Sequence, residues 1–213
     1  MSKEVTKFLK VREVLSPSRA YPNDAGIDFY VPKFTKSFID SLKNKNEFLA
    51  KEVEINRLQY GSIIINGSHQ EVILDQNKTH FKYDESVGKL YFILPPQSRV
   101  LIPSGIHVRM SNNNRALIAA NKSGVASKMG LIFGSQVVDY SYKGEIHISV
   151  INTSTDIVRI YEDMKIIQFI ETPVITNQLE ISEAIDDNSL STFYLGMIDD
   201  RKDGGFGSTS KNN

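Results

Sequence analysis

The residues best suited to chemistry include a glycine-rich stretch, GGFGSTS, at residues 204–210. Successive glycines expose backbone N–H groups, which can bind phosphate oxygens. The hydroxyls of Ser208 and Thr209 and the guanidinium of Arg201 add donors that suit the same ligand. Phe206 stands alone between glycines, where it has no core to join but could stack on a base. The alternative is a flexible tail, which its composition alone would favour.

Two other short stretches carry groups that could act on a phosphate ester. In VVDYSYKGE (137–145), Asp139 follows an apolar run, and a carboxylate at a strand end can hold and deprotonate a water. Tyr142 in the same stretch could pack flat against a sugar. In NKSG (121–124), Lys122, Ser123 and Gly124 form a second candidate phosphate contact. A plain hairpin and a plain turn remain the alternatives for these two stretches.

Two polar residues lie within or beside apolar strand patterns. In DAGID (24–28), Gly26 suits a tight backbone position and Asp28 could contact a metal through water, although a turn entering a strand explains both. Gln168 is a polar side chain inside the apolar run KIIQFI (165–170), where it either serves a ligand or points out of the sheet.

Composition limits the classes of function. The chain has 213 residues, is 40% hydrophobic, and carries 25 basic and 25 acidic residues, so no broad attraction to nucleic acid or to an anionic membrane is expected. It has no cysteine, which excludes disulfides and thiolate chemistry, and its four histidines lack metal-ligand spacing. The polar N-terminus and the lack of a long apolar run predict a soluble, cytoplasmic protein, in the host cytoplasm if it is viral.

Strand patterns dominate the elements that must position these residues. Short runs rich in Val and Ile recur at residues 99–110, 115–120, 131–140, 145–152, 156–161 and 165–170. In the run EIHISVIN, apolar residues alternate strictly, which places Ile146, Ile148 and Val150 on one face. Short, even spacing by turn residues predicts an antiparallel sandwich or jelly roll rather than βαβ units.

Two stretches depart from this pattern. Residues 35–88 are rich in Lys and Asn, begin with a helix-like piece in which Phe38 and Leu42 lie one turn apart, and continue with strand-like runs at 62–65 and 71–74. We interpret them as an inserted α/β excursion from a β body formed by residues 1–34 and 89–197. Residues 198–213 hold three glycines and no periodicity, which predicts a mobile C-terminal arm.

Each of these stretches is a weak signal by itself, but their order along the chain is informative. They are PNDAGIDFY (22–30), NKSGVASKMGL (121–131), VVDYSYKGE (137–145), KIIQFI (165–170) and RKDGGFGSTS (201–210). In this order they resemble the five motifs of the trimeric, all-β dUTPases (deoxyuridine 5′-triphosphate nucleotidohydrolases). Residues 8–34 and 89–210 are covered by the resemblance, whereas residues 35–88 have no counterpart in a minimal member. Such an insertion and the Lys/Asn-rich composition suggest a phage or viral member.

The resemblance implies a jelly-roll-like β-barrel and a homotrimer whose three active sites each take motifs from all three chains. It also implies Mg²⁺-assisted hydrolysis of dUTP to dUMP and pyrophosphate, with Asp139 activating the water that attacks the α-phosphorus. Asp28 would touch the metal through water, Tyr142 would pack on the deoxyribose and Phe206 would cover the uracil. The remaining implied substrate-binding residues are Lys122, Ser123, Gly124, Gln168, Arg201, Gly207, Ser208 and Thr209.

The sequence departs from the family motifs at some positions, and two alternative functions remain open. Lys122 stands where the second motif usually has arginine, which replaces a bidentate phosphate contact with a point charge, and Lys165 stands at the usual arginine of the fourth motif. A dCTP deaminase shares the fold, but its catalytic glutamate would fall at Ser149. The other rival is a dUTPase-fold regulatory protein that binds a partner protein through residues 35–88.

Overall fold

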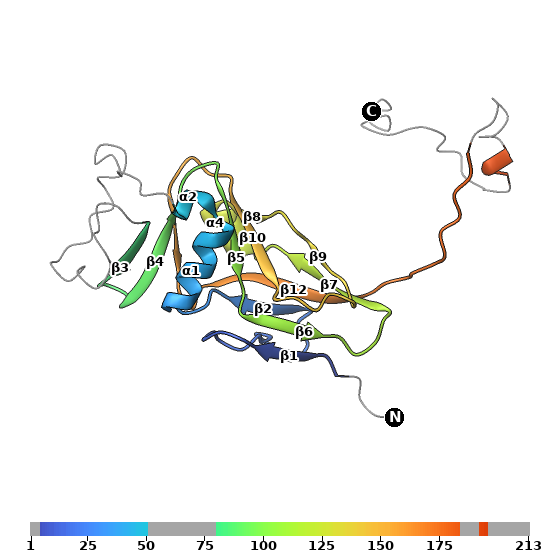
Figure 1. Cartoon of the computed structure of the whole chain (residues 1–213), viewed down its shortest axis with the longest axis horizontal. Helices are drawn as coiled ribbons and strands as arrows, with labels where there is room; N and C mark the ends of the chain where they lie inside the picture. Colours follow the sequence, from blue (N-terminus) through green and yellow to red (C-terminus); the bar gives the residue numbers. More distant parts are fainter. Residues whose placement is uncertain (1–4, 51–79, 184–191, 196–213) are drawn as a thin grey trace. The chain divides into compact units, whose positions relative to one another are not determined.

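The structure, a computed structural model, describes residues 5–50, 80–183 and 192–195 of the chain (Figure 1). Strands predominate in these residues, and every strand pair among them is antiparallel. The predicted all-β, jelly-roll-like class is therefore confirmed.

The strands are β1 (Lys7–Lys10), β2 (Gly26–Tyr30), β3 (Phe81–Asp84), β4 (Lys89–Leu94), β5 (Arg99–Pro103), β6 (Ile106–Arg109), β7 (Arg115–Ala120), β8 (Leu131–Phe133), β9 (Val137–Val138), β10 (His147–Asn152), β11 (Val158–Tyr161) and β12 (Lys165–Pro173). The helices are α1 (Lys36–Lys45), α2 (Glu47–Ala50) and α4 (Ser123–Met129). They form four small sheets with the orders β1-β6, β5-β10-β8, β11-β4-β3 and β2-β12-β7-β9. The last of these sheets carries most of the candidate site.

The predicted strand patterns correspond to strands in the structure. The run at residues 99–110 divides into β5 and β6 at Gly105, whose φ of 74° suits glycine. Along β10 the alternation holds, because Ile148 and Val150 are buried while their neighbours are half-buried; Ile146, just before the strand, is buried too. One apolar face per strand thus builds a single core.

Helix α1 begins after Thr35, whose Oγ1 accepts a hydrogen bond from the Phe38 backbone N–H at 3.3 Å. The helix packs against β5, and Phe38 and Leu42, one turn apart, are both fully buried. The helix predicted at this point is confirmed. Its buried face belongs to the same core as the strands, so the start of the segment 35–88 is part of the barrel packing.

The other end of that segment also packs into the body, because β3 pairs with β4 from Phe81↔Phe92 to Asp84↔Lys89. Its middle, residues 51–79, with the predicted strand-like runs at 62–65 and 71–74, lies outside the described residues. No helix in the described parts of the chain is long and apolar enough to cross a membrane.

The chain divides into two compact units, residues 1–175 and 176–213. The first holds all the strands and the core. In the second, the described residues include Leu179 and Ile181, both strongly exposed, and a contact between the Phe193 and Tyr194 rings at 5.0 Å.

Candidate active site

Strands β2, β12 and β7 lie side by side and bring three predicted motifs to one level (Figure 1). Gln168 on β12 faces Asp28 on β2 and Ala120 on β7. Because Lys122 follows β7 by two residues, it leaves the sheet beside Asp28 and Gln168. The structure therefore brings together residues of the first, second and fourth motifs.

Asp28 forms the centre of this cluster. Its side chain is 4% exposed, and its two oxygens bind different lysines: Oδ1 pairs with Lys122 Nζ, and Oδ2 lies 2.9 Å from Lys165 Nζ. Burial raises the pKa of Asp28, but the hydrogen bonds and charges of Lys122 and Lys165 outweigh it, so the pKa lies below its usual value. The carboxylate stays ionised, and the trio carries one net positive charge.

Lys165 is a site residue that the sequence motifs did not single out for binding. Its hydrogen bond to Asp28 raises its pKa above the usual value for lysine, despite some burial. Its ammonium group also lies 5.7 Å from the centre of the Tyr30 ring, a cation–π contact. The position of Lys165 at the usual arginine of the fourth motif was the signal that could have identified it.

Gln168 is held in place rather than pointing freely out of the sheet. Its Nε2 donates to the Asn121 carbonyl at 2.9 Å, just before Lys122. Gly26 leaves room for it, because a Cβ at residue 26 would lie 2.2 Å from Gln168 Oε1. The glycine of the first motif thus permits the close approach of the fourth.

Ser123 and Gly124 open helix α4, which the sequence patterns did not predict, since NKSG was interpreted as a candidate phosphate contact between strand runs, with a plain turn as the alternative. Both residues are exposed, and the helix is anchored by Val125 and ends at Gly130, whose φ is 65°. Both directly follow Lys122 in the chain, which places them close to the Asp28 cluster.

Asp139 and Tyr142 lie at the other end of the same sheet. Strand β9 pairs with β7 through Leu117↔Val138, so Asp139 follows at the level of Ala116. This level is four residues from Ala120, or about 13 Å at the usual rise of a strand. The structure therefore does not bring Asp139 to Asp28 within one chain. Asp139 is exposed.

Tyr142 folds back on its own loop. Its hydroxyl donates to the Glu145 carbonyl at 2.8 Å, and its ring covers Gly144, where a Cβ would lie 2.6 Å from the ring carbon Cζ. Tyr142 as a whole residue is 43% exposed. The predicted site residues in and beside the glycine-rich stretch lie outside the described residues; they are Arg201, Phe206, Gly207, Ser208 and Thr209.

The cluster suits an anionic ligand that brings its own cation. Two ammonium groups converge on the ionised carboxylate of Asp28, and Gln168 lies opposite Asp28 on the neighbouring strand, so cationic and amide donors for phosphate oxygens lie close together. Among the described residues, no group of three or more His, Cys, Asp or Glu side chains could hold a metal. A Mg²⁺ ion, which keeps several waters and is often held by substrate phosphates, fits this donor set only as a phosphate-bound ion.

Comparison with known proteins bears on this arrangement. A family model described as dUTPase matches residues 80–209. A curated deoxyuridine 5′-triphosphate nucleotidohydrolase from Azoarcus sp. is 30% identical over 121 residues, which cover 56% of this chain and 74% of that protein.

Solved structures agree on the fold. The dUTPase of Staphylococcus bacteriophage 80alpha, a mutant with dUpNHpp, has a TM-score of 0.60 at 15% identity, over 97% of this chain and 99% of that one. A mutant dUTPase of phage phi11 of S. aureus, described with a structural Mg(II) ion, has a TM-score of 0.53 at 15% identity, over 86% and 99%.

The fold and the Asp28 cluster define an all-β protein with a cationic site at one end of a four-stranded sheet. With the matched residues 80–209, the chain belongs to the dUTPase family. The structure gives the deaminase alternative no support, because the position of its catalytic glutamate is Ser149 on β10, which has no carboxylate.

Proposed function

We propose that this protein hydrolyses dUTP to dUMP and pyrophosphate. Family membership supports the reaction, and the observation that carries the assignment is the convergence of Asp28, Lys122 and Gln168 at one end of the sheet. Phosphoryl-type reactions need mainly charge neutralisation and in-line positioning. The lysines of the cluster supply positive charge, and the Gln168 amide helps to position the phosphates.

The triphosphate is held by groups around Asp28. Lys122 and Lys165 donate to phosphate oxygens as point charges, and Ser123, Gly124 and Gln168 add uncharged donors. The side chains of the two lysines are 23% and 40% exposed, so ligand oxygens can reach them without disturbing the core. Asp28 fixes both ammonium groups before the substrate arrives, which reduces the ordering cost of binding.

When bound, Mg²⁺ would come with the triphosphate and would supply charge neutralisation at its oxygens. Both oxygens of Asp28 already accept bonds from lysines. Asp28 therefore contacts the ion through a water, using its remaining lone pairs. No described cluster offers a direct cage of protein ligands.

Asp139 orients and deprotonates the attacking water, and Tyr142 packs against the deoxyribose. The exposed position of Asp139 at the end of β9 leaves its carboxylate open to a ligand. The arm residues Arg201, Phe206, Gly207, Ser208 and Thr209 close over the phosphates and the uracil. Closure of such a segment excludes bulk water while the nucleophile stays in place.

A homotrimer completes the site in this proposal. Asp139 and the Asp28 cluster lie about 13 Å or more apart along the sheet of one chain, a span set by the strand rise. A single water cannot bridge them while it attacks a bound phosphorus. In this proposal, Asp139 of one chain serves the Asp28 cluster of another.

A substrate panel tests the activity. The pure protein is incubated with Mg²⁺ and each of dUTP, dCTP, dTTP, dATP and dGTP, and pyrophosphate and ammonia are measured. We expect pyrophosphate from dUTP alone. Ammonia from dCTP would indicate the deaminase instead, and no product from any nucleotide would leave a regulatory protein acting through residues 35–88.

A further inference from the structure

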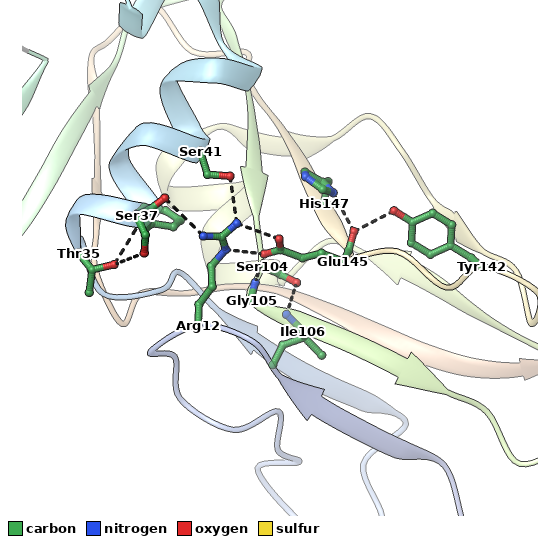
Figure 2. A network of polar contacts seen from close by, with 11 residues as sticks. Arg12, Thr35, Ser37, Ser41, Ser104, Gly105, Ile106, Tyr142, Glu145 and His147 are labelled. Carbon is green, nitrogen blue, oxygen red and sulfur yellow. Dashed lines mark hydrogen bonds and ion pairs between the residues drawn. The ribbon is translucent and has the colours of Figure 1, made fainter.

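Glu145, directly after the third motif's Tyr-Lys-Gly, is held by an unusually complete set of contacts (Figure 2). Arg12 Nε donates to Oε1 at 2.8 Å and Arg12 Nη2 donates to Oε2 at 3.0 Å, which is a bidentate pair. The Gly105 backbone N–H donates to Oε1 at 2.7 Å. We call the pair of Arg12 and Glu145 the clamp.

The clamp is largely shielded from water, because the two side chains are only 17% and 14% exposed. Burial raises the pKa of Glu145, but the bonds from Arg12 and Gly105 outweigh it, so the pKa lies below its usual value. The pair is therefore charged on both sides. A buried bidentate ion pair fixes geometry more strictly than an exposed one.

Arg12 joins the clamp to helix α1. Its Nη2 donates to Ser41 Oγ at 3.0 Å, and its Nη1 lies 3.5 Å from the Ser37 carbonyl (Figure 2). Helix α1 lies at the start of the segment 35–88, which a minimal family member lacks. The clamp thus connects that segment to the third motif.

The backbone of Glu145 in turn holds Tyr142. The Tyr142 hydroxyl donates to the Glu145 carbonyl at 2.8 Å, and the same oxygen lies 2.8 Å from His147 Nδ1 (Figure 2). The ring covers Gly144, where a Cβ would lie 2.5 Å from the Tyr142 hydroxyl. The position of the Tyr142 ring therefore depends on the position of the Glu145 backbone.

We propose that Arg12 and Glu145 are positioning residues for Tyr142, and that through it they set the preference for deoxyribose over ribose nucleotides. This inference rests on the proposed role of Tyr142 against the sugar. Packing alone rejects an added hydroxyl by a factor on the order of 10². Such rejection depends on a ring held to about 0.5 Å, because a looser ring yields to the 2′-hydroxyl.

Two conservative variants test the clamp. Arg12→Lys keeps the charge but loses the planar fork, and Glu145→Gln keeps the shape but loses the charge. Ser41→Ala removes the side-chain contact between Arg12 and α1 and leaves the contact of Arg12 with the Ser37 carbonyl. The matched control is Arg159→Lys, which alters another ion pair, between Arg159 Nη1 and Asp84 Oδ2 at 3.3 Å, on a different sheet. Thermal unfolding of each variant confirms that it is folded.

The readout is the ratio of kcat/KM for dUTP to that for UTP. We expect the ratio to fall about tenfold in Arg12→Lys and in Glu145→Gln, a part of the 10² that packing supplies. The double variant should fall no further than either single one, because both act through one pair. Ser41→Ala should shift the ratio less and in the same direction, while Arg159→Lys should leave it unchanged.

An unchanged ratio in folded Arg12→Lys or Glu145→Gln, or an equal fall in Arg159→Lys, overturns the inference. The ratio of the dissociation constants of dUDP and UDP is measured in parallel, since it needs no turnover. A wild-type protein that prefers dUDP but does not hydrolyse dUTP contradicts the proposed function. The clamp is then tested by whether its variants lose the preference for dUDP over UDP. A wild-type protein that binds both equally overturns the clamp.

Discussion

Lys165 Nζ lies 2.9 Å from Asp28 Oδ2, at the opposite oxygen from the one that Lys122 binds. One buried carboxylate thus aligns two ammonium groups, one from the start of β12 and one from the residue that precedes helix α4. Lys165 and Lys122 occupy the positions where arginines are usual in the family motifs. The shared carboxylate compensates for the lost fork by fixing each ammonium group directly.

Lys165→Ala is expected to raise the KM for dUTP about tenfold or more, because a hydrogen bond to a charged group contributes about 1.5–3 kcal/mol. Lys165→Arg should retain most of the affinity, since it keeps the charge. Steady-state kinetics measure both. Arg159→Ala is the matched control: it breaks the ion pair with Asp84 at 3.3 Å, which lies on the separate sheet β11-β4-β3, and should leave KM unchanged. Equal KM values in Lys165→Ala and the wild type would remove Lys165 from the site.

Gly26→Ala is expected to displace Gln168, because the new Cβ would lie 2.2 Å from Oε1 at the end of that flexible side chain. Activity should fall as far as it does in Gln168→Ala, while stability changes by less than about 1 kcal/mol, since alanine favours an ordered strand over glycine. In the Gln168→Ala background, Gly26→Ala should have almost no further effect on kcat/KM. A full additional loss there would show that Gly26 acts independently of Gln168.

Asp139→Asn is expected to keep the fold and nucleotide binding and to lower kcat by roughly 10²-fold or more, as when a positioned general base is lost. Binding of dUpNHpp by calorimetry separates the two effects. Turnover close to that of the wild type would exclude Asp139 as the base.

His80 is expected to make stability depend on pH between the ranges of the carboxylates and of the lysines. It is 7% exposed, and its Nε2 is buried without a hydrogen-bond partner. Burial lowers its pKa from 6.5, with smaller lowering from Lys82 and Lys43, while a backbone bond at Phe48 acts in the opposite sense. The unfolded chain therefore binds a proton first, so stability is fully present above pH 6.5 and is lost as pH falls through the lowered pKa.

Chemical denaturation from pH 7.5 down to about pH 5 measures this effect, since the carboxylates titrate mainly below that range. His80→Gln should have a flatter profile over the same interval. A wild-type profile already flat between pH 6.5 and pH 5 would contradict the assignment.

The local patterns were enough to predict most strands and helix α1. The alternation of Ile146, Ile148 and Val150 predicts which face of the strand is buried, and the spacing of Phe38 and Leu42 does the same for the helix. The structure buries both faces. Helix α4 was not predicted, because its seven residues, SGVASKM, contain a single buried residue, Val125, and no helical apolar periodicity. Short helices of this kind depend on their tertiary contacts.

The site was predictable as a set of residues but not as an arrangement. The motifs name Asp28, Lys122 and Gln168, but only the pairing of β2, β12 and β7 shows that they meet. The contacts of Lys165 with Asp28 and of Arg12 with Glu145 join distant parts of the chain, and no sequence pattern encodes such pairs. The separation of Asp139 from this cluster likewise follows only from strand register.

Hydrolysis of dUTP in H₂¹⁸O tests the central claim most directly, because the label reports which phosphorus the water attacks. The account predicts dUMP and pyrophosphate as the only products, with ¹⁸O in the phosphate of dUMP and none in pyrophosphate. Label in pyrophosphate, release of inorganic phosphate, or an absence of dUMP would contradict a water activated for attack on the α-phosphorus.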